Sequence, residues 1–149
     1  MSCTTESASG AVGSVTGSSG TLGSTGVGAG FALATRFADE AVVVSNGDPA
    51  SLRDAAHATE LLLQERTIPA RLIVNRVSAR MFGKMCATID DVMDTVGLPL
   101  LGIVPEDASV TLAAAEGLPL VQYTGRGAAR ACLNIARRLC GKKMPLLHL

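Results

Sequence analysis

From residue 31 onward, apolar residues alternate between short continuous blocks and stretches in which they recur at helical spacing. The continuous blocks at 41–45, 71–75 and 98–104 are typical of strands that are buried on both faces. The helical spacing predicts helices at 31–37, 48–66, 88–97, 108–116 and 125–140. Strands that alternate with helices indicate right-handed crossovers, so we expect an α/β fold with a parallel sheet of about three strands covered by helices.

Local signals mark the ends of two of these helices. Asp48 is followed by Pro49, a favoured pairing of a capping residue with proline at the first helical position. Thr88 and Asp91 stand three residues apart, as in a capping box, and Gly97 follows where that helix should end. These signals fix the expected starts of both helices more sharply than periodicity alone.

The N-terminal part has a different composition. Residues 1–24 are rich in Gly, Ser and Thr, which offer little apolar surface to bury, so we predict a flexible, low-complexity leader there. The outer edge of the strand at 41–45 would then be bare unless another segment or a partner covered it. We therefore divide the chain into a leader at 1–24, one α/β unit at 25–141 and a basic, apolar tail at 142–149.

Composition bounds the class of protein. A chain of 149 residues suffices for one domain, and no apolar run approaches the ~18 residues that a membrane span needs. The four cysteines and two histidines form no metal-ligand or disulfide pattern, which indicates reduced thiols in a cytoplasmic protein. Formal net charge is zero, but beyond Gly117 there are six bases and no acid. This basic stretch beyond Gly117 favours binding to an anionic partner. Alternatively, its bases form the solvated face of a helix.

Polar residues follow each of the three expected strands. In an open α/β sheet, ligands bind beyond the carboxyl ends of the strands, where this chain has 46–48, 75–76 and 105–107. The Asn75 amide can both donate to and accept from an adenine edge, and the Arg76 guanidinium can stack on a base or pair with a carboxylate. An asparagine at a strand end is also a common turn former.

Four segments carry a family resemblance, in order along the chain: ADEAVVVSNGDPASLRDA, LIVNRV, IDDVMDTVGLPLLGIVPED and LAAAEGLPL. Together they resemble the C-terminal half of the MinD-type septum-site-determining ATPases, of the ParA/MinD class of P-loop ATPases. The resemblance implies ATP and Mg²⁺ as ligands of the parent family. It places on the base side of the nucleotide Asn75, Arg76, Pro105, Glu106 and Asp107. It places near a dimer or partner surface Asn46, Asp48, Ser51, Arg53 and Asp54, although the family usually has Pro-Glu where this chain has Gly47-Asp48.

The phosphate-binding half of that family's signature does not occur in these residues. A P-loop needs a lysine after its glycines, whereas the first lysine here is Lys84. The stretch GSTGVGAGF at 23–31 resembles a family switch, but Leu22 stands where the metal-side aspartate belongs. We therefore expect a truncated relative that does not hydrolyse ATP by itself and binds it weakly or not at all. A shifted reading frame before residue 25 would explain the leader; a natural flexible leader is the alternative.

The tail is a candidate membrane-surface segment. Members of the family end in a basic amphipathic helix that lies on anionic membrane. The candidate residues here are Arg138, Lys142, Lys143, Leu146 and Leu147. Pro145 prevents one continuous helix, and the alternative is that the tail tucks into a groove of the protein.

The expected function is therefore that of a truncated MinD-like ATPase of bacterial cell-division site selection, cytoplasmic and peripheral at the inner face of the membrane. Two alternatives stay open: a non-enzymatic interaction module that pairs with itself or a full-length relative as a decoy, and a fragment without function. Chromosome-partitioning and iron-protein relatives also share the class, but no cluster-ligating cysteine pattern supports the latter. No nucleic-acid partner is expected.

Overall fold

The computed structural model describes residues 12–17, 20–25, 31, 35, 38–65, 68–78 and 88–146. Its strands are β1 (Val12–Gly17), β2 (Gly20–Thr25), β3 (Glu40–Asn46), β4 (Ala70–Val77) and β5 (Leu100–Pro105). Its helices are α2 (Pro49–Glu65), α4 (Ile89–Val96), α5 (Ala108–Ala115), α6 (Leu120–Tyr123) and α7 (Gly127–Leu139). The short α6 has no counterpart in the sequence prediction, and the helix expected at 31–37 lies largely outside the described residues.

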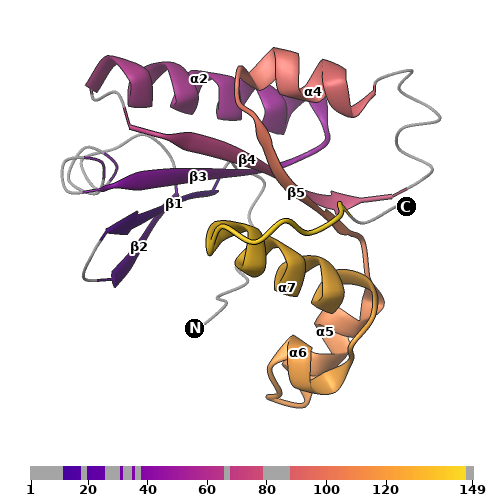
Figure 1. Cartoon of the computed structure of the whole chain (residues 1–149). Helices are drawn as coiled ribbons and strands as arrows, with labels where there is room; N and C mark the ends of the chain where they lie inside the picture. The colour runs from indigo at the N-terminus through magenta and orange to yellow at the C-terminus, as the bar shows by residue number, and fades with distance from the viewer. Residues whose placement is uncertain are drawn as a thin grey trace.

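The sheet contains the predicted parallel strands and two more. Its order is β2-β1-β3-β4-β5, with β3, β4 and β5 parallel (Figure 1). We expected a flexible leader through residue 24, whereas the structure describes two strands there, β1 and β2, which form an antiparallel hairpin. β1 then pairs with β3, from Val12 opposite Val44 to Thr16 opposite Glu40, and covers the edge that we expected to be bare. Backbone hydrogen bonds between strands do not need apolar side chains, so composition alone misses such a hairpin.

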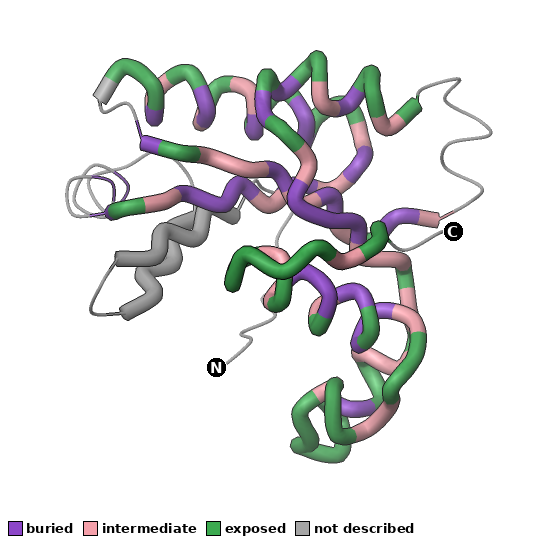
Figure 2. The backbone as a smooth tube through the Cα atoms, viewed as in Figure 1, coloured by how far each residue is buried: buried purple, intermediate pink, exposed green. Residues whose placement is uncertain are grey.

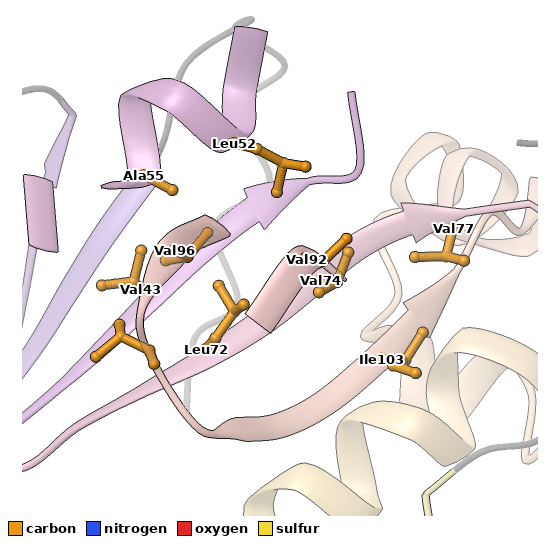
Figure 3. Close-up of a cluster of buried hydrophobic side chains, with 10 residues drawn as sticks. Val43, Leu52, Ala55, Leu72, Val74, Val77, Val92, Val96 and Ile103 are labelled. Atoms are coloured by element: carbon orange, nitrogen blue, oxygen red, sulfur yellow. The ribbon is translucent and has the colours of Figure 1, made fainter. Parts of the chain in front are cut away.

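Helices cover both faces of the parallel strands. α2 and α4 lie on one face and α7 lies on the other, against β5 (Figure 1). Between the sheet and the first pair of helices is the main cluster of buried apolar side chains (Figure 3). Its members are Val43, Leu52, Ala55, Leu72, Val74, Val77, Val92, Val96, Leu98 and Ile103. The valine-rich blocks of the sequence thus supply a continuous core, as their pattern predicts.

The predicted helix starts are confirmed. The Asp48 carboxylate accepts hydrogen bonds from the N–H and hydroxyl of Ser51, at 2.9 and 2.7 Å, and so caps α2. Thr88 and Asp91 form a capping box at α4, and Gly97 ends that helix in the left-handed region with φ 74°. These local signals fix where the crossover helices begin after β3 and before β5.

On the second face of the sheet the apolar cluster is smaller, and the packing of α7 depends on one close contact. A small cluster of Val42, Leu101 and Ile135 joins the sheet to α7. Gly102 lets α7 approach, because a Cβ at this position would lie 2.3 Å from the Cγ1 atom of Ile135. By contrast, α5 and α6 project from the body and are mostly exposed (Figure 2).

Candidate functional site

The carboxyl ends of β3, β4 and β5 bring together polar residues that are distant in sequence. Asn46 of β3 pairs in register with Asn75 of β4. Beyond them, Val77 of β4 lies opposite Pro105 of β5, and the N–H of Glu106 donates to the carbonyl of Val77 at 2.9 Å. The structure therefore gathers Asn46, Asn75 and Glu106 at one edge of the sheet, as the topology predicts.

Arg76 has the most unusual backbone at this edge. Its φ is 54°, and it is the sole non-glycine residue with positive φ in the part of the chain that the structure describes. The register between β4 and β5 shifts between Val74 and Val77, as in a β-bulge. For a residue with a Cβ, the left-handed conformation costs about 1–2 kcal/mol, and such bulges turn side chains toward binding sites.

A weak ion pair crosses this edge. The guanidinium of Arg76 lies 3.5 Å from the carboxylate of Glu106, and the two side chains are 64% and 58% exposed. Such an exposed, long pair contributes at most about 1 kcal/mol. A ligand can therefore displace or share either partner at low cost, which suits a binding surface better than a structural bridge.

The Asp107 carboxylate, unlike that of Glu106, accepts hydrogen bonds from backbone N–H groups of the protein. Its Oδ1 atom accepts from the Ser109 N–H and its Oδ2 atom accepts from the Ala128 N–H, both at 2.9 Å. The Ala128 bond, followed by the Ser109 bond, lowers the pKa of this carboxyl below its ordinary value. Both oxygens thus serve the starts of α5 and α7, so these contacts do not favour the predicted contact between Asp107 and a base.

The residues expected at a partner surface are divided by the fold. Asp48 and Ser51 bond to one another at the α2 cap, and Ser51 is buried. Asn46 is half-buried, whereas Arg53 and Asp54 are exposed on α2. Of the five residues, the exposed pair Arg53 and Asp54 remains available for contact with a partner.

Known MinD proteins are similar to most of this chain. A putative septum site-determining protein MinD of Mesostigma viride is 38% identical over 128 residues, which is 83% of this chain and 44% of that protein. Septum site-determining protein MinD of Bacillus subtilis is 36% identical over 123 residues, or 81% of this chain and 46% of that protein. The chain thus spans less than half the length of these relatives. No family model matches it.

Solved MinD structures agree. The MinD cell division protein of Aquifex aeolicus superposes with a TM-score of 0.76 at 31% identity, over 83% of this chain and 52% of that one. A chain of the MinC:MinD cell division protein complex of that organism has the same TM-score, identity and coverage of this chain, and 51% of that chain is covered. This is a partial MinD-like chain.

A more distant structure extends the likeness of fold. The Pyrococcus horikoshii septum site-determining protein MinD, complexed with Mg-ADP, has a TM-score of 0.64 at 24% identity, over 78% of this chain and 47% of that one. The MinD-like chain therefore has the α/β fold of the MinD and ParA P-loop ATPases, which confirms the predicted fold class.

In the MinD-like chain, the described part of the tail, residues 142–146, folds back on α7. The side-chain amide of Asn134 donates to the carbonyl of Pro145 at 3.4 Å, and Arg138 donates to the carbonyl of Leu100 at 3.5 Å. Pro145 and Leu146 thereby line a shallow groove between β5 and α7. Lys142 and Lys143 remain exposed, and Leu147 lies outside the described residues. Arg138 thus forms a hydrogen bond within the protein. No helix in the described part of the chain is long and apolar enough to span a membrane.

Two functional features escaped the sequence analysis. The left-handed Arg76 has no local signal, because arginine rarely adopts this conformation. The Asp107–Ala128 bond joins residues 21 positions apart. Gly127, just before Ala128, is the one hint in the sequence, because glycine at a helix start permits a close approach of another chain segment.

The Asp48 cap predicts a dependence of stability on pH. Hydrogen bonds from the Ser51 N–H and hydroxyl lower the pKa of Asp48, so its stabilisation is present above the unfolded-state pKa and is lost as pH falls through the folded-state pKa. We expect Asp48→Ala to lower the free energy of unfolding by about 0.5–2 kcal/mol at pH 7 and by less at pH 3. Urea unfolding at both values measures this, with Asp54→Ala, an exposed acid of the same helix, as the control. An equal loss at both pH values would contradict it.

Proposed function

We propose that the chain supplies the base-side half of a MinD-like nucleotide site and serves in cell-division site selection. The observation that carries this is the bulged, left-handed Arg76 facing Glu106 at the carboxyl edge of the sheet. In open α/β sheets this edge is where ligands bind, and strained residues concentrate at such sites. Arg76 would stack on the base and Asn75 would pair with its polar edge.

The isolated chain of 149 residues should not hydrolyse ATP. Phosphoryl transfer depends almost entirely on positioning and electrostatic stabilisation of the phosphates and Mg²⁺. In P-loop ATPases the P-loop lysine and backbone amides supply this, together with acids that hold the metal. The 149 residues contain no G-x-x-x-x-G-K-[ST] motif. The base-side residues alone are left to bind the ligand, so a nucleotide would gain little from its phosphates.

The test compares ligands with and without phosphates. We expect adenosine and Mg-ATP to bind the isolated chain with similar, weak affinity, and no ATP turnover above buffer. Arg76→Ala should weaken adenosine binding about 2- to 30-fold, because a stacked cation contributes about 0.5–2 kcal/mol. Two-dimensional NMR titration measures both constants.

Arg53→Ala is the matched control, because Arg53 is an exposed arginine on α2 rather than at the carboxyl edge of the sheet. A micromolar dissociation constant for ATP, or steady turnover that is lost in Asn75→Ala, would show that the chain binds phosphates after all. Adenosine binding that Arg76→Ala leaves unchanged would place the base elsewhere.

A second candidate function is an interaction module without catalysis. The specific observation is α5, whose sequence ASVTLAAA carries no charge and is apolar except for Ser109 and Thr111, although Ala113 is its one buried residue. Leu112, Leu118 and Val121 are 52%, 44% and 46% exposed. Exposed apolar side chains that lie close together are typical of a protein interface, so a second copy or a full-length MinD relative is the partner we infer. Molar mass in solution, alone and with such a relative, distinguishes this candidate from a monomeric nucleotide binder.

We also propose that the protein is cytoplasmic and attaches weakly to anionic membrane through its tail. Lys142 and Lys143 are exposed, and each basic residue near an anionic surface gains about 1 kcal/mol. We expect sedimentation with phosphatidylglycerol vesicles at low salt, independent of ATP and reduced by the double substitution Lys142→Glu, Lys143→Glu. Arg53→Glu, on α2, changes the charge as much as either single substitution, Lys142→Glu or Lys143→Glu, and is the control for each of them. Equal binding to neutral and anionic vesicles, or none at low salt, would leave the tail as packing.

A further inference from the structure

Asp107 joins the loop after β5 to the start of a helix that comes much later in the chain. It is the N-cap residue of α5, with Oδ1 on the Ser109 N–H. Its other oxygen accepts from the Ala128 N–H in the first turn of α7. Arg126, the N-cap residue of α7, makes no capping bond with its own side chain, so the Asp107 carboxylate takes that role.

The approach of Asp107 to α7 depends on Gly127. This residue has φ 51°, and a Cβ on it would lie 2.2 Å from the Oδ2 atom of Asp107. A side chain at this position would therefore both strain the backbone and push the carboxylate away. Glycine at position 127 thus leaves the room that the Asp107–Ala128 bond requires. The contact therefore depends on the residue type at this position.

The charge of the group suits two helix starts at once. Aspartate is ordinarily ionised at neutral pH, and the bonds from Ala128 and Ser109 lower the pKa of Asp107 further. A negative charge is favourable at a helix N-terminus, where unpaired N–H groups carry partial positive charge. The geometry and the charge agree that this residue holds α5 and α7 together.

The residue next to Asp107 is Glu106, the partner of Arg76. That ion pair is long and exposed, so it does not fix its own geometry. The backbone on either side of Glu106 does: its N–H bonds to Val77 of β4, and Asp107 is anchored to α7. A shift of Glu106 caused by a ligand would therefore be felt at the first turn of α7.

We propose that Asp107 is a positioning residue, which holds Glu106 opposite Arg76 through its bond to Ala128 and couples this pair to the first turn of α7. The inference rests on the proposed base-side site. It adds a role for a residue that does not contact the base, and a link between the carboxyl edge of the sheet and α7.

Asp107→Ser separates the two bonds. A serine hydroxyl is a good helix cap and preserves the bond to the Ser109 N–H. Serine has a shorter side chain with a single oxygen, which cannot reach the Ala128 N–H as well. Asp107→Ala removes both bonds. Gly127→Ala disrupts the Ala128 bond from the side of α7 and leaves the sequence of the loop after β5 unchanged. If one of these variants fails to fold, the others still test the same contact.

The experiment is a titration of the full chain with adenosine, followed by the amide signals of Glu106 and Ala128 in two-dimensional NMR spectra. In the wild type, we expect both amides to shift with the same dissociation constant. In Asp107→Ser and Gly127→Ala, the Ala128 shift should be lost, and adenosine binding should weaken about 2- to 12-fold, the equivalent of one hydrogen bond. A purely structural cap would not make the Ala128 amide respond to the ligand.

Two results would overturn the inference while leaving the base-side site intact. One is adenosine binding to Asp107→Ser with wild-type affinity; the other is a wild-type Ala128 amide that does not move while Glu106 does. Should adenosine shift neither Arg76 nor Glu106 in the wild type, the proposed function itself is wrong, and the inference is overturned with it. Fold integrity is checked by the shift dispersion of Val43 and Val96, core valines that do not adjoin Asn75, Arg76 or Glu106 in the sequence.

Discussion

Leu72→Ala should lower the free energy of unfolding by about 2–5 kcal/mol, the range for truncating a buried leucine. Leu72 is 0% exposed, and it lies in β4 at the centre of the cluster beneath α2 and α4 (Figure 3). The substitution removes apolar atoms and leaves a cavity that the packed neighbours can fill only in part. A loss of this size is a large share of the stability of a single domain, about 5–15 kcal/mol. Urea unfolding followed by circular dichroism measures it.

Leu63→Ala is the matched control, because Leu63 is 49% exposed near the end of α2. Its loss should stay within about 0.5 kcal/mol, as for other surface positions. If the two variants unfold at the same urea concentration, Leu72 does not lie in a packed core, and the described sheet is not the one that forms in solution.

Gly102→Ala should lower the free energy of unfolding by about 1–3 kcal/mol, even though it adds just one methyl group. The new Cβ would lie 2.3 Å from the Cγ1 atom of Ile135, so α7 must move away from β5 or Ile135 must leave its rotamer. Replacing glycine also restricts the unfolded chain, which offsets about 0.4–1 kcal/mol where the new residue fits. The steric cost is the larger of the two, so the net change is destabilising.

Two further variants make this prediction specific to the contact. Gly125→Ala, where a Cβ meets nothing within 4 Å, should be neutral or slightly stabilising. Ile135→Ala removes the clashing atoms, since the next atom, the Cβ of Ile135, is 3.7 Å away. The double variant Gly102→Ala, Ile135→Ala should therefore lose less than the sum of the single changes. Additive losses would mean that α7 does not pack against Gly102.

The sequence predicted the parallel part of the fold because that information is local. Blocks of valine and leucine at 41–45, 71–75 and 98–104 specify buried strands, and Asp48 and Thr88 mark helix starts by bonds that span three residues. Once the strands are parallel, their polar carboxyl ends must meet at one edge. The grouping of Asn75, Arg76 and Glu106 could therefore be predicted without coordinates.

The tertiary structure decided the features in which one segment depends on another that is distant in the chain. The hairpin of β1 and β2 forms by backbone pairing, which leaves no mark on a Gly/Ser/Thr composition. The left-handed conformation of Arg76 costs free energy locally and persists because the pairing of β4 with β5 on both sides imposes it. From the sequence alone, the Asp107 carboxylate could equally have contacted a ligand. In the structure it accepts a hydrogen bond from the N–H of Ala128, 21 residues away. Hydrophobic periodicity and helix capping act within a few residues, so they can be recognised in the sequence. The contacts named here form only when distant segments come together in the folded chain.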